Sequence, residues 1–193
     1  MENKLYHEDD WDELLDGKTV AMSPRPAVNH GKVVENIYSI FRRNFKDKQC
    51  TAFSDGYDVY LTENDRVVPD VMVVCDKNII KNEGIRGVPD LIVEVLSPST
   101  ARTDKGYKKR LYGKCGVKEY WIVDINNKTV EIYIQRDGVL EFEDSYSVLP
   151  DYIFNKMNDE DKKTVKTEFN PHIFPGVKIS LHEIFENIFF IGM

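Results

Sequence analysis

The chain has few cysteines and histidines among its 193 residues, and neither residue type is spaced for a familiar site. Cys50, Cys75 and Cys115 are odd in number, widely separated and without a C-x-x-C pair. They predict neither a disulfide framework nor a zinc site, and we expect reduced thiols. The four histidines show no metal-ligand spacing. A G-x-S-x-G nucleophile elbow and a glycine-rich phosphate loop are also missing from the sequence.

Long apolar runs are absent as well. No segment approaches the length of about 20 residues that spans a bilayer, and the start, MENKLYHEDDWDEL, has no apolar signal-peptide core. We therefore expect a cytoplasmic protein. The net charge of -7 argues against a surface coated with nucleic acid, because neutralisation of phosphates dominates nonspecific affinity. With 41% hydrophobic residues, the chain suffices for one packed core, and we expect a single domain over residues 1–193.

One carboxylate lies inside an apolar run. Glu94 belongs to LIVEVL, residues 91–96, a pattern that indicates a strand buried on both faces. A carboxylate without water must lose its charge or find a cation or hydrogen-bond donor, because an unpaired buried charge is too costly. We therefore expect this strand to meet a positive group.

A second carboxylate, Asp70, opens the apolar run of residues 71–74 and follows Pro69, which suits the entrance of a strand. Asp90 precedes Glu94 by four residues, about 13 Å along one strand, so these two cannot share a metal ion. Asp70, on a different strand, can face Glu94 across a sheet whose neighbouring strands are about 4.8 Å apart. Asp70 and Glu94 are therefore the predicted pair.

The segment that follows, ARTDKGYKKRLYGKCGVK over residues 101–118, has seven Lys or Arg and one acid. It predicts a helix that starts at Ser99 or Thr103 and stops at Gly116. Two stripes recur every four residues: a buried one of Tyr107, Leu111 and Cys115, and a neighbouring one of Asp104, Lys108 and Tyr112. Because the helix begins where the Glu94 strand ends, its first turns come close to that carboxylate.

The remaining elements follow from hydrophobic periodicity and turn residues. We expect a short acidic helix near 7–16, a strand near 18–23, an amphipathic helix over 29–46, and strands near 50–54, 57–62, 67–75 and 90–96. Residues 120–125 and 129–134 form a β-hairpin, and a turn follows at Arg136-Asp137-Gly138. Residues 150–170 are a polar surface excursion, and a short strand and a last helix follow from Val177. A mixed sheet flanked by helices is the expected architecture.

Several spaced stretches resemble the Uma-two family of restriction endonucleases, part of the PD-(D/E)XK nuclease superfamily. They are VVPDVMVVCD, GVPDLIVEVLSPST, the D-x3-K-x3-Y spacing of Asp104, Lys108 and Tyr112, GVKEYWIVD, Met22-Ser23-Pro24, His30 and FPGVKISLHEIF. The resemblance runs over nearly the whole chain. It implies an α/β (α+β) fold: a restriction-endonuclease-like mixed β-sheet flanked by helices, with an additional C-terminal hairpin region.

By this resemblance, Asp70 and Glu94 are metal ligands. Leu96 stands where the superfamily motif has its lysine, so the lysine would come from the helix. Lys108 fits the family spacing best, while Lys105 and Lys109 stay open as alternatives. Acidic oxygen ligands suit Mg²⁺ or Mn²⁺, which acidifies a bound water, and a nearby lysine would orient that water.

We therefore predict a metal-dependent endonuclease that hydrolyses DNA, with Asp70, Glu94 and Lys108 as catalytic residues. The candidate DNA contacts are His30, Arg102, Lys105, Lys109, Arg110 and Lys114. A homodimer is a further expectation, because many restriction-type nucleases need two sites to cut two strands. Two other interpretations stay open. The carboxylates could form a structural salt bridge, or the chain could be a catalytically inactive module of the same fold that binds nucleic acid or serves assembly.

Overall fold

The computed structural model describes residues 12–22 and 27–189, and its centre is a six-stranded sheet in the order β12-β11-β10-β9-β6-β3. These strands are β3 (Thr51–Ser54), β6 (Val71–Val74), β9 (Leu91–Val95), β10 (Glu119–Asp124), β11 (Thr129–Arg136) and β12 (Val139–Ser147). β9 and β10 are parallel and the other neighbours antiparallel, so the sheet is mixed, as predicted.

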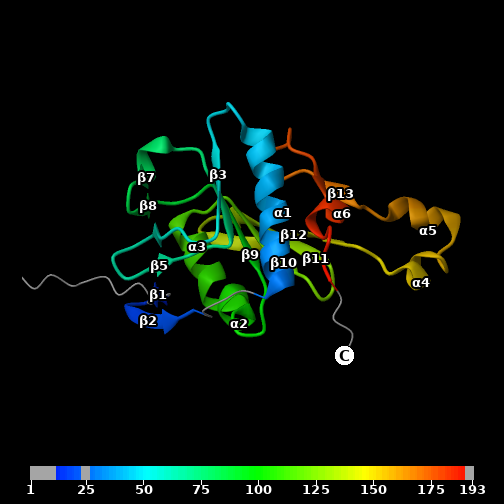
Figure 1. Ribbon diagram of the computed structural model, residues 1–193, viewed down its shortest axis with the longest axis horizontal. Helices are drawn as coiled ribbons and strands as arrows, with labels where there is room; N and C mark the ends of the chain where they lie inside the picture. Colours follow the sequence, from blue (N-terminus) through cyan, green and yellow to red (C-terminus); the bar gives the residue numbers. More distant parts are fainter. Residues whose placement is uncertain (1–11, 23–26, 190–193) are drawn as a thin grey trace, which may run out of the picture.

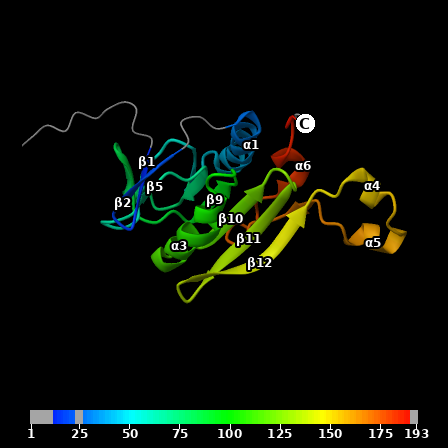
Figure 2. The same cartoon turned by 90° about the horizontal axis from the view of Figure 1, so that it is seen from below.

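Helices cover both faces of this central sheet, which confirms the predicted α+β class (Figures 1 and 2). The helix α1 (Val28–Phe45) lies on one face. A second helix lies on the other face and has three parts: α2 (Ala101–Thr103), a π-helical turn at Asp104–Lys108, and α3 (Lys109–Cys115). Because strand residues alternate between faces, Val71, Val73 and Val93 pack in the core beneath α1, whereas Met72 and Ile92 pack in the core beneath α3.

A second, peripheral sheet has the order β2-β1-β5-β4-β8-β7. Its strands are β1 (Asp12–Leu15), β2 (Lys18–Ala21), β4 (Val59–Tyr60), β5 (Arg66–Val67), β7 (Ile80–Lys81) and β8 (Gly84–Arg86). A 3-10 turn, Lys77–Ile79, precedes β7. The chain ends with α4 (Asp151–Phe154), α5 (Asp159–Thr164), β13 (Glu168–Phe169), β14 (Ile179–Ser180) and α6 (Leu181–Ile184).

The predicted helix near 7–16 is wrong where the structure describes it, because Asp12–Leu15 is the strand β1. This strand pairs with β2 and, through Leu14 and Arg66, with β5. Glu13 and Leu15 are buried while their neighbours are less so, which is the two-residue period of a strand. Residues 7–11 of that prediction lie outside the described part of the chain, as does residue 23 of the strand predicted near 18–23.

The other elements follow the sequence prediction, with several differences. The 3-10 turn and the strands β7, β8 and β13 were not predicted. The run 67–75 divides into β5 and β6 on either side of Pro69. The strand β12 follows the predicted turn at residues 136–138 but was not itself predicted. The polar excursion carries the short helices α4 and α5, which project from the sheet in Figure 2. Among the described helices, none is both long and apolar enough to cross a bilayer.

The expectation of reduced thiols is wrong for two of the three cysteines, because Cys50 and Cys75 form a disulfide. Thr51 pairs with Val74 in the antiparallel β3 and β6, so the next pair outward is Cys50 and Cys75. This register, which no cysteine spacing reveals, places the two side chains opposite each other. Cys115 remains a free thiol.

The basic segment is helical and ends at Gly116, whose φ of 95° gives the left-handed cap that suits glycine. The predicted stripe packs on the core, with Leu111 buried, but the neighbouring stripe is buried more deeply. Asp104, Lys108 and Tyr112 are all buried, whereas Tyr107 and Cys115 are half-buried. A π-helical turn holds one more residue than an α-helical turn and changes which side chains face the sheet. It spans Asp104–Lys108, so two charged residues lie against the strands.

Candidate active site

Asp70 and Glu94 meet across the β6–β9 pair. Val71 pairs with Val93 in this antiparallel ladder, so the same register extended by one residue sets Asp70 opposite Glu94. The backbone N–H of Val95 donates a hydrogen bond to Asp70 Oδ2 at 2.7 Å, which fixes the aspartate beside β9. Asp70 lies two residues before Met72, and Glu94 lies two residues after Ile92. Both carboxylates therefore face the same side of the sheet as Met72 and Ile92, which pack in the core on the α3 side.

Lys108 reaches this pair from the helix on the same face. Its Nζ lies 3.2 Å from Glu94 Oε1, 2.8 Å from Glu13 Oε1 and 3.6 Å from Asp104 Oδ1. All four residues are buried. Burial lowers the pKa of Lys108, but the three carboxylates outweigh burial and leave it raised, so the lysine is an ammonium ion. The positive group that the Glu94 strand requires is therefore present.

Glu94 is held in one orientation. Tyr112, fully buried, donates its phenolic hydrogen to Glu94 Oε1 at 2.7 Å, the same oxygen that Lys108 contacts. No described residue donates a hydrogen bond to Oε2, so this second oxygen is available for another partner. Burial raises the pKa of Glu94 well above its usual value; Lys108 opposes this shift, and the charges of Asp104, Asp70 and Glu13 add to it.

His30 joins the first turns of α1 to both strands. Its Nε2 lies 2.9 Å from the carbonyl oxygen of Val95 and 3.5 Å from Asp70 Oδ1. A carbonyl oxygen accepts, so this nitrogen carries hydrogen. Burial lowers the pKa of His30, but the hydrogen bond and charge of Asp70 outweigh burial and leave the pKa raised. The histidine lines the site rather than an open DNA-binding face.

Apart from Tyr112, which lies behind Glu94, these side chains line a cavity of about 610 Å³. Three buried side-chain atoms have no hydrogen-bond partner among the described residues: His30 Nδ1, Asp55 Oδ1 and Asp104 Oδ1. All three residues line this cavity. Buried polar groups are nearly always satisfied, so unpartnered atoms that converge on one cavity indicate water, an ion or a ligand. Burial also raises the pKa of Asp55 and of Asp104.

The donor set of the cavity fits a divalent cation. Five acidic side chains line it, from Glu13, Asp55, Asp70, Glu94 and Asp104, together with the Lys108 ammonium and His30. Carboxylate oxygens are the ligands of Mg²⁺ and Mn²⁺, and Mg²⁺ usually takes one or two protein carboxylates and keeps several waters. Within the described residues, no group of three or more His, Cys, Asp or Glu side chains is placed to hold a metal ion. An open site with two protein ligands agrees with both observations.

The other predicted cations lie elsewhere. Lys105 Nζ lies 3.3 Å from Glu131 Oε1, and Lys109 Nζ lies 3.7 Å from the centre of the Tyr133 ring. Both contacts direct these lysines toward β11, so of the three candidate catalytic lysines the geometry favours Lys108. Arg102, Arg110 and Lys114 are exposed on the same helical segment.

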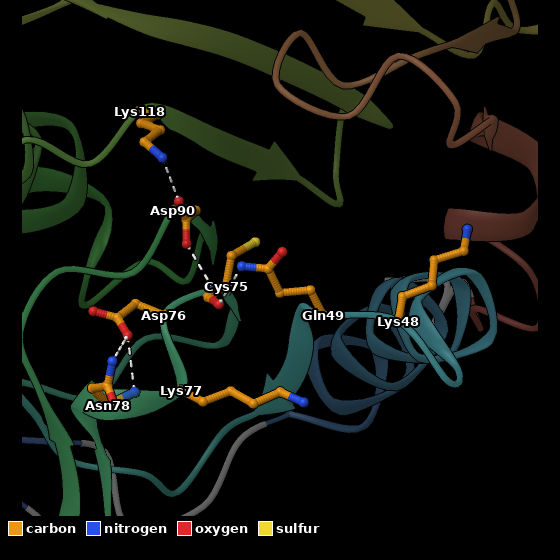
Figure 3. A pocket seen from close by; sticks show the side chains of 8 residues that line it. All are labelled: Lys48, Gln49, Cys75, Asp76, Lys77, Asn78, Asp90 and Lys118. Atoms are coloured by element: carbon orange, nitrogen blue, oxygen red, sulfur yellow. Dashed lines mark hydrogen bonds and ion pairs between the residues drawn. The ribbon is translucent and has the colours of Figure 1, made fainter.

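A second cavity, about 710 Å³, lies at the opposite end of β6 and β9 (Figure 3). Its Asp90 accepts from Lys118 at 2.6 Å and from the backbone N–H of Cys75 at 2.8 Å. Both carboxylate oxygens therefore have partners within the protein. Asp90 is therefore a structural residue, in agreement with its exclusion from the metal pair by its distance along the strand. None of the three unpartnered buried atoms belongs to a residue that lines this cavity.

Sequence reasoning missed two residues of the site, Glu13 and Asp55. Glu13 reaches it from β1, in the segment predicted to be helical, although its alternation with Leu15 was a signal for an inward-facing strand residue. Asp55 directly follows β3 and carries no pattern of its own. Tyr112 was placed on the same helix stripe as Lys108 and in the family spacing, but its hydrogen bond to Glu94 was not predicted.

Known proteins share sequence and fold with this chain. The family model "Uma2: Putative restriction endonuclease" matches residues 3–159. Two proteins of Synechocystis sp. are each 28% identical to this chain. "Uncharacterized protein slr1290" matches over 127 residues, which are 65% of this chain and 66% of that protein. "Uncharacterized protein sll1609" matches over 125 residues, which are 63% of this chain and 70% of that protein.

A crystal structure from Anabaena variabilis, described as "a putative nuclease belonging to DUF820", superposes with a TM-score of 0.69. The match covers 94% of this chain and 93% of that chain at 21% sequence identity, so the two proteins share a fold.

Proposed function

Because this chain belongs to the family described as "Uma2: Putative restriction endonuclease", we propose that it is a metal-dependent endonuclease that hydrolyses DNA phosphodiester bonds. The observation that carries the proposal is the cavity at the β6–β9 ends. Two opposed acids and a buried ammonium converge there, and all three unpartnered buried atoms of the described residues line it.

In this proposal Asp70 and Glu94 hold one Mg²⁺ or Mn²⁺ ion. When bound, such an ion stabilises charge on the phosphate and acidifies a water molecule. The contacts of the protein prepare both ligands: Val95 N–H fixes one Asp70 oxygen, and Tyr112 and Lys108 occupy one Glu94 oxygen. Glu94 Oε2 has no donor among the described residues, and Asp70 Oδ1 lies 3.5 Å from His30 Nε2, so these second oxygens are the proposed ligand atoms.

Lys108 is the proposed catalytic cation. Its ammonium is preorganised by buried carboxylates, so it needs no rearrangement when negative charge develops on the phosphate. Exposed Arg102, Arg110 and Lys114 are the proposed phosphate contacts outside the cavity. Cleavage of both strands of a duplex calls for two such sites, so we propose a homodimer as the form that cuts duplex DNA.

The test combines metal binding with cleavage. Calorimetry should detect Mn²⁺ binding by the wild type that disappears in Asp70→Asn. Plasmid and single-stranded DNA should be cut in Mn²⁺ by the wild type and left intact by Glu94→Ala. The matched control is Asp90→Asn, because Asp90 is an acid that directly precedes β9, the strand that carries Glu94. This variant should behave as wild type. Equal Mn²⁺ binding by all variants, with no cleavage by any, would instead favour a non-enzymatic module that binds nucleic acid or serves assembly.

A further inference from the structure

The shortest ion pair of Lys108 joins it to a residue that lies outside the central sheet. Glu13 belongs to β1 of the peripheral sheet, and its Oε1 lies 2.8 Å from Lys108 Nζ, closer than Glu94 or Asp104. The side chains are 6% and 4% exposed, so solvent does not screen the pair. An ion pair this deep persists only where geometry and further hydrogen bonds compensate the loss of water.

Glu13 makes a second contact, with the segment that leads to Asp70 and β6. Its Oε1 accepts the backbone N–H of Val68 at 2.9 Å, two residues before Asp70. One carboxylate oxygen therefore joins the catalytic helix to the segment that leads into β6. Glu13 thus contacts the lysine of the proposed site and the segment that precedes its aspartate, without being a proposed ligand itself.

The hairpin that carries Glu13 is docked by further polar contacts. Arg66 of β5 forms ion pairs with Asp12 and, at 2.9 Å, with Asp58. The backbone N–H of Asp16 donates to Asp65 Oδ1 at 3.0 Å, and Tyr107, the residue before Lys108, donates to the same oxygen at 2.6 Å. The β1–β2 turn and the helix that carries the lysine are thus fixed to one aspartate.

We infer that Glu13 is a positioning residue that holds the Lys108 ammonium beside Glu94, and that the N-terminal hairpin is therefore part of the active site. The inference rests on the proposed role of Lys108. Once a divalent ion engages Asp70 and Glu94, the charge of Glu94 is shared with that ion, and Lys108 needs a partner that the ion does not engage. Glu13 is that partner, assisted by Asp104 at 3.6 Å.

Glu13→Gln tests this step because it keeps the size of the side chain and an oxygen for Val68 N–H while removing the charge. We expect kcat to fall about 100-fold, the loss typical of a misplaced catalytic group, with KM and Mn²⁺ affinity unchanged. Glu13→Asp keeps the charge on a shorter side chain and should recover part of kcat. Glu183→Gln neutralises another ion-paired glutamate, 2.7 Å from Arg43, and should leave kcat unchanged.

A second measurement does not depend on activity. Trace acetylation with acetic anhydride, mapped by mass spectrometry, should leave buried Lys108 nearly unlabelled in the wild type and label exposed Lys118. In Glu13→Gln the labelling of Lys108 should rise toward that of Lys118, and in Glu13→Asp it should stay low. Unchanged labelling in Glu13→Gln overturns the inference, as does unchanged kcat. A wild type that cuts no DNA overturns the proposed function instead, while the labelling still decides whether Glu13 holds Lys108.

Discussion

Two buried glutamates on neighbouring strands differ in how their oxygens are satisfied. Glu119 of β10 is fully buried, and its oxygens accept from Trp121 Nε1 at 2.7 Å and from the backbone N–H of Ile173 at 2.9 Å. Glu94 of β9 has both of its donors on one oxygen and lies beside other carboxylates. Burial of an acid therefore does not identify a site, whereas an unused oxygen that faces a cavity does.

The first prediction concerns the pH dependence of stability without divalent ions. The folded-state pKa of Glu94 is raised above 4.5, so its ionisation disfavours the folded state, and stability falls as pH rises from about that value through the folded pKa. Glu94→Gln removes this fall. Its free energy of unfolding at pH 7 should equal that of the wild type or exceed it by up to about 2 kcal/mol. Urea denaturation at several pH values measures the difference.

The opposite result has a defined meaning. If Glu94→Gln lost ~3 to 5 kcal/mol at neutral pH, Glu94 and Lys108 would be a structural ion pair whose breakage leaves a buried charge. Asp104 and Glu13 make this loss unexpected, since both remain beside Lys108 in the variant.

A second prediction isolates the hydroxyl that orients Glu94. Tyr112→Phe removes the 2.7 Å hydrogen bond and should weaken Mn²⁺ binding by about tenfold, the lower end of the range for lost ligand-orienting bonds. Tyr120→Phe is the matched control. Its ring is equally buried and packs against Tyr112, but its hydroxyl donates to the carbonyl oxygen of Asp104. Calorimetry on both variants should separate them, and equal affinities would remove Tyr112 from the site.

At the residue scale, the sequence predicts that a buried carboxylate needs a cationic partner, but it does not predict the residues that reach the site only through tertiary contacts. The apolar surroundings of Glu94 indicated a cationic partner, and the family resemblance favoured Lys108, which lies 3.2 Å away. Glu13 is 81 residues from Glu94 in the sequence, and its approach depends on how one hairpin docks. No local pattern encodes that docking.

At the scale of elements, the segment of residues 101–115 combines two functions along its length. Its π-helical turn brings Asp104 and Lys108 to the cavity, and α3 then packs closely on the sheet. Helical periodicity predicted the element and its glycine stop but assumed 3.6 residues per turn, and so did not show that the stripe of Asp104, Lys108 and Tyr112 is the more deeply buried one. Periodicity also failed for β1, because four residues are too few to distinguish the two-residue period of a strand from the 3.6-residue period of a helix.

The two glycines of this segment should respond oppositely to the same substitution. A Cβ at Gly106 meets no atom within 4 Å, so Gly106→Ala should raise the free energy of unfolding by about 0.5 to 1 kcal/mol through helix propensity. A Cβ at Gly113 would lie 2.9 Å from the backbone nitrogen of Leu140, so Gly113→Ala should cost about 1 to 3 kcal/mol. Urea denaturation compares them, and effects of the same sign would contradict the close packing of α3 on β12.

At the scale of the whole molecule, the core extends beyond the residues that the family model matches. Val177, Ile179, Leu181 and Ile184 lie after residue 159 and pack in the same cluster as α1 and the central sheet. A segment that shares a core with the rest is expected to fold with it, which supports the proposal of one domain over 1–193. Hydrophobic patterning found the last strand and helix, but the disulfide could not be read from it, because it depends on the register of β3 and β6.

With a net charge of -7, the proposed nucleic-acid contacts should be confined to local basic patches, so catalysis and binding should be separable by substitution. Lys108→Met should abolish cleavage while DNA affinity is nearly kept, because its buried charge acts mainly on the transition state. Its fold must be checked by circular dichroism, since the loss of Lys108 leaves acids unpaired. Exposed Arg102, Arg110 or Lys114, changed singly to Ala, should weaken binding and lower the log-log salt slope by about one unit per lost phosphate contact.

Lys105 and Lys109 supply the internal control for this separation. They lie on the same helical segment, but Glu131 and the Tyr133 ring engage them, so Lys105→Met and Lys109→Met should change the salt slope less than Arg102→Ala and leave kcat unchanged. Fluorescence anisotropy over a salt series and single-turnover cleavage in Mn²⁺ measure the two effects. An active Lys108→Met beside an inactive Lys105→Met or Lys109→Met would reassign the catalytic lysine. Full activity in all three variants would leave the buried ammonium with a structural role alone.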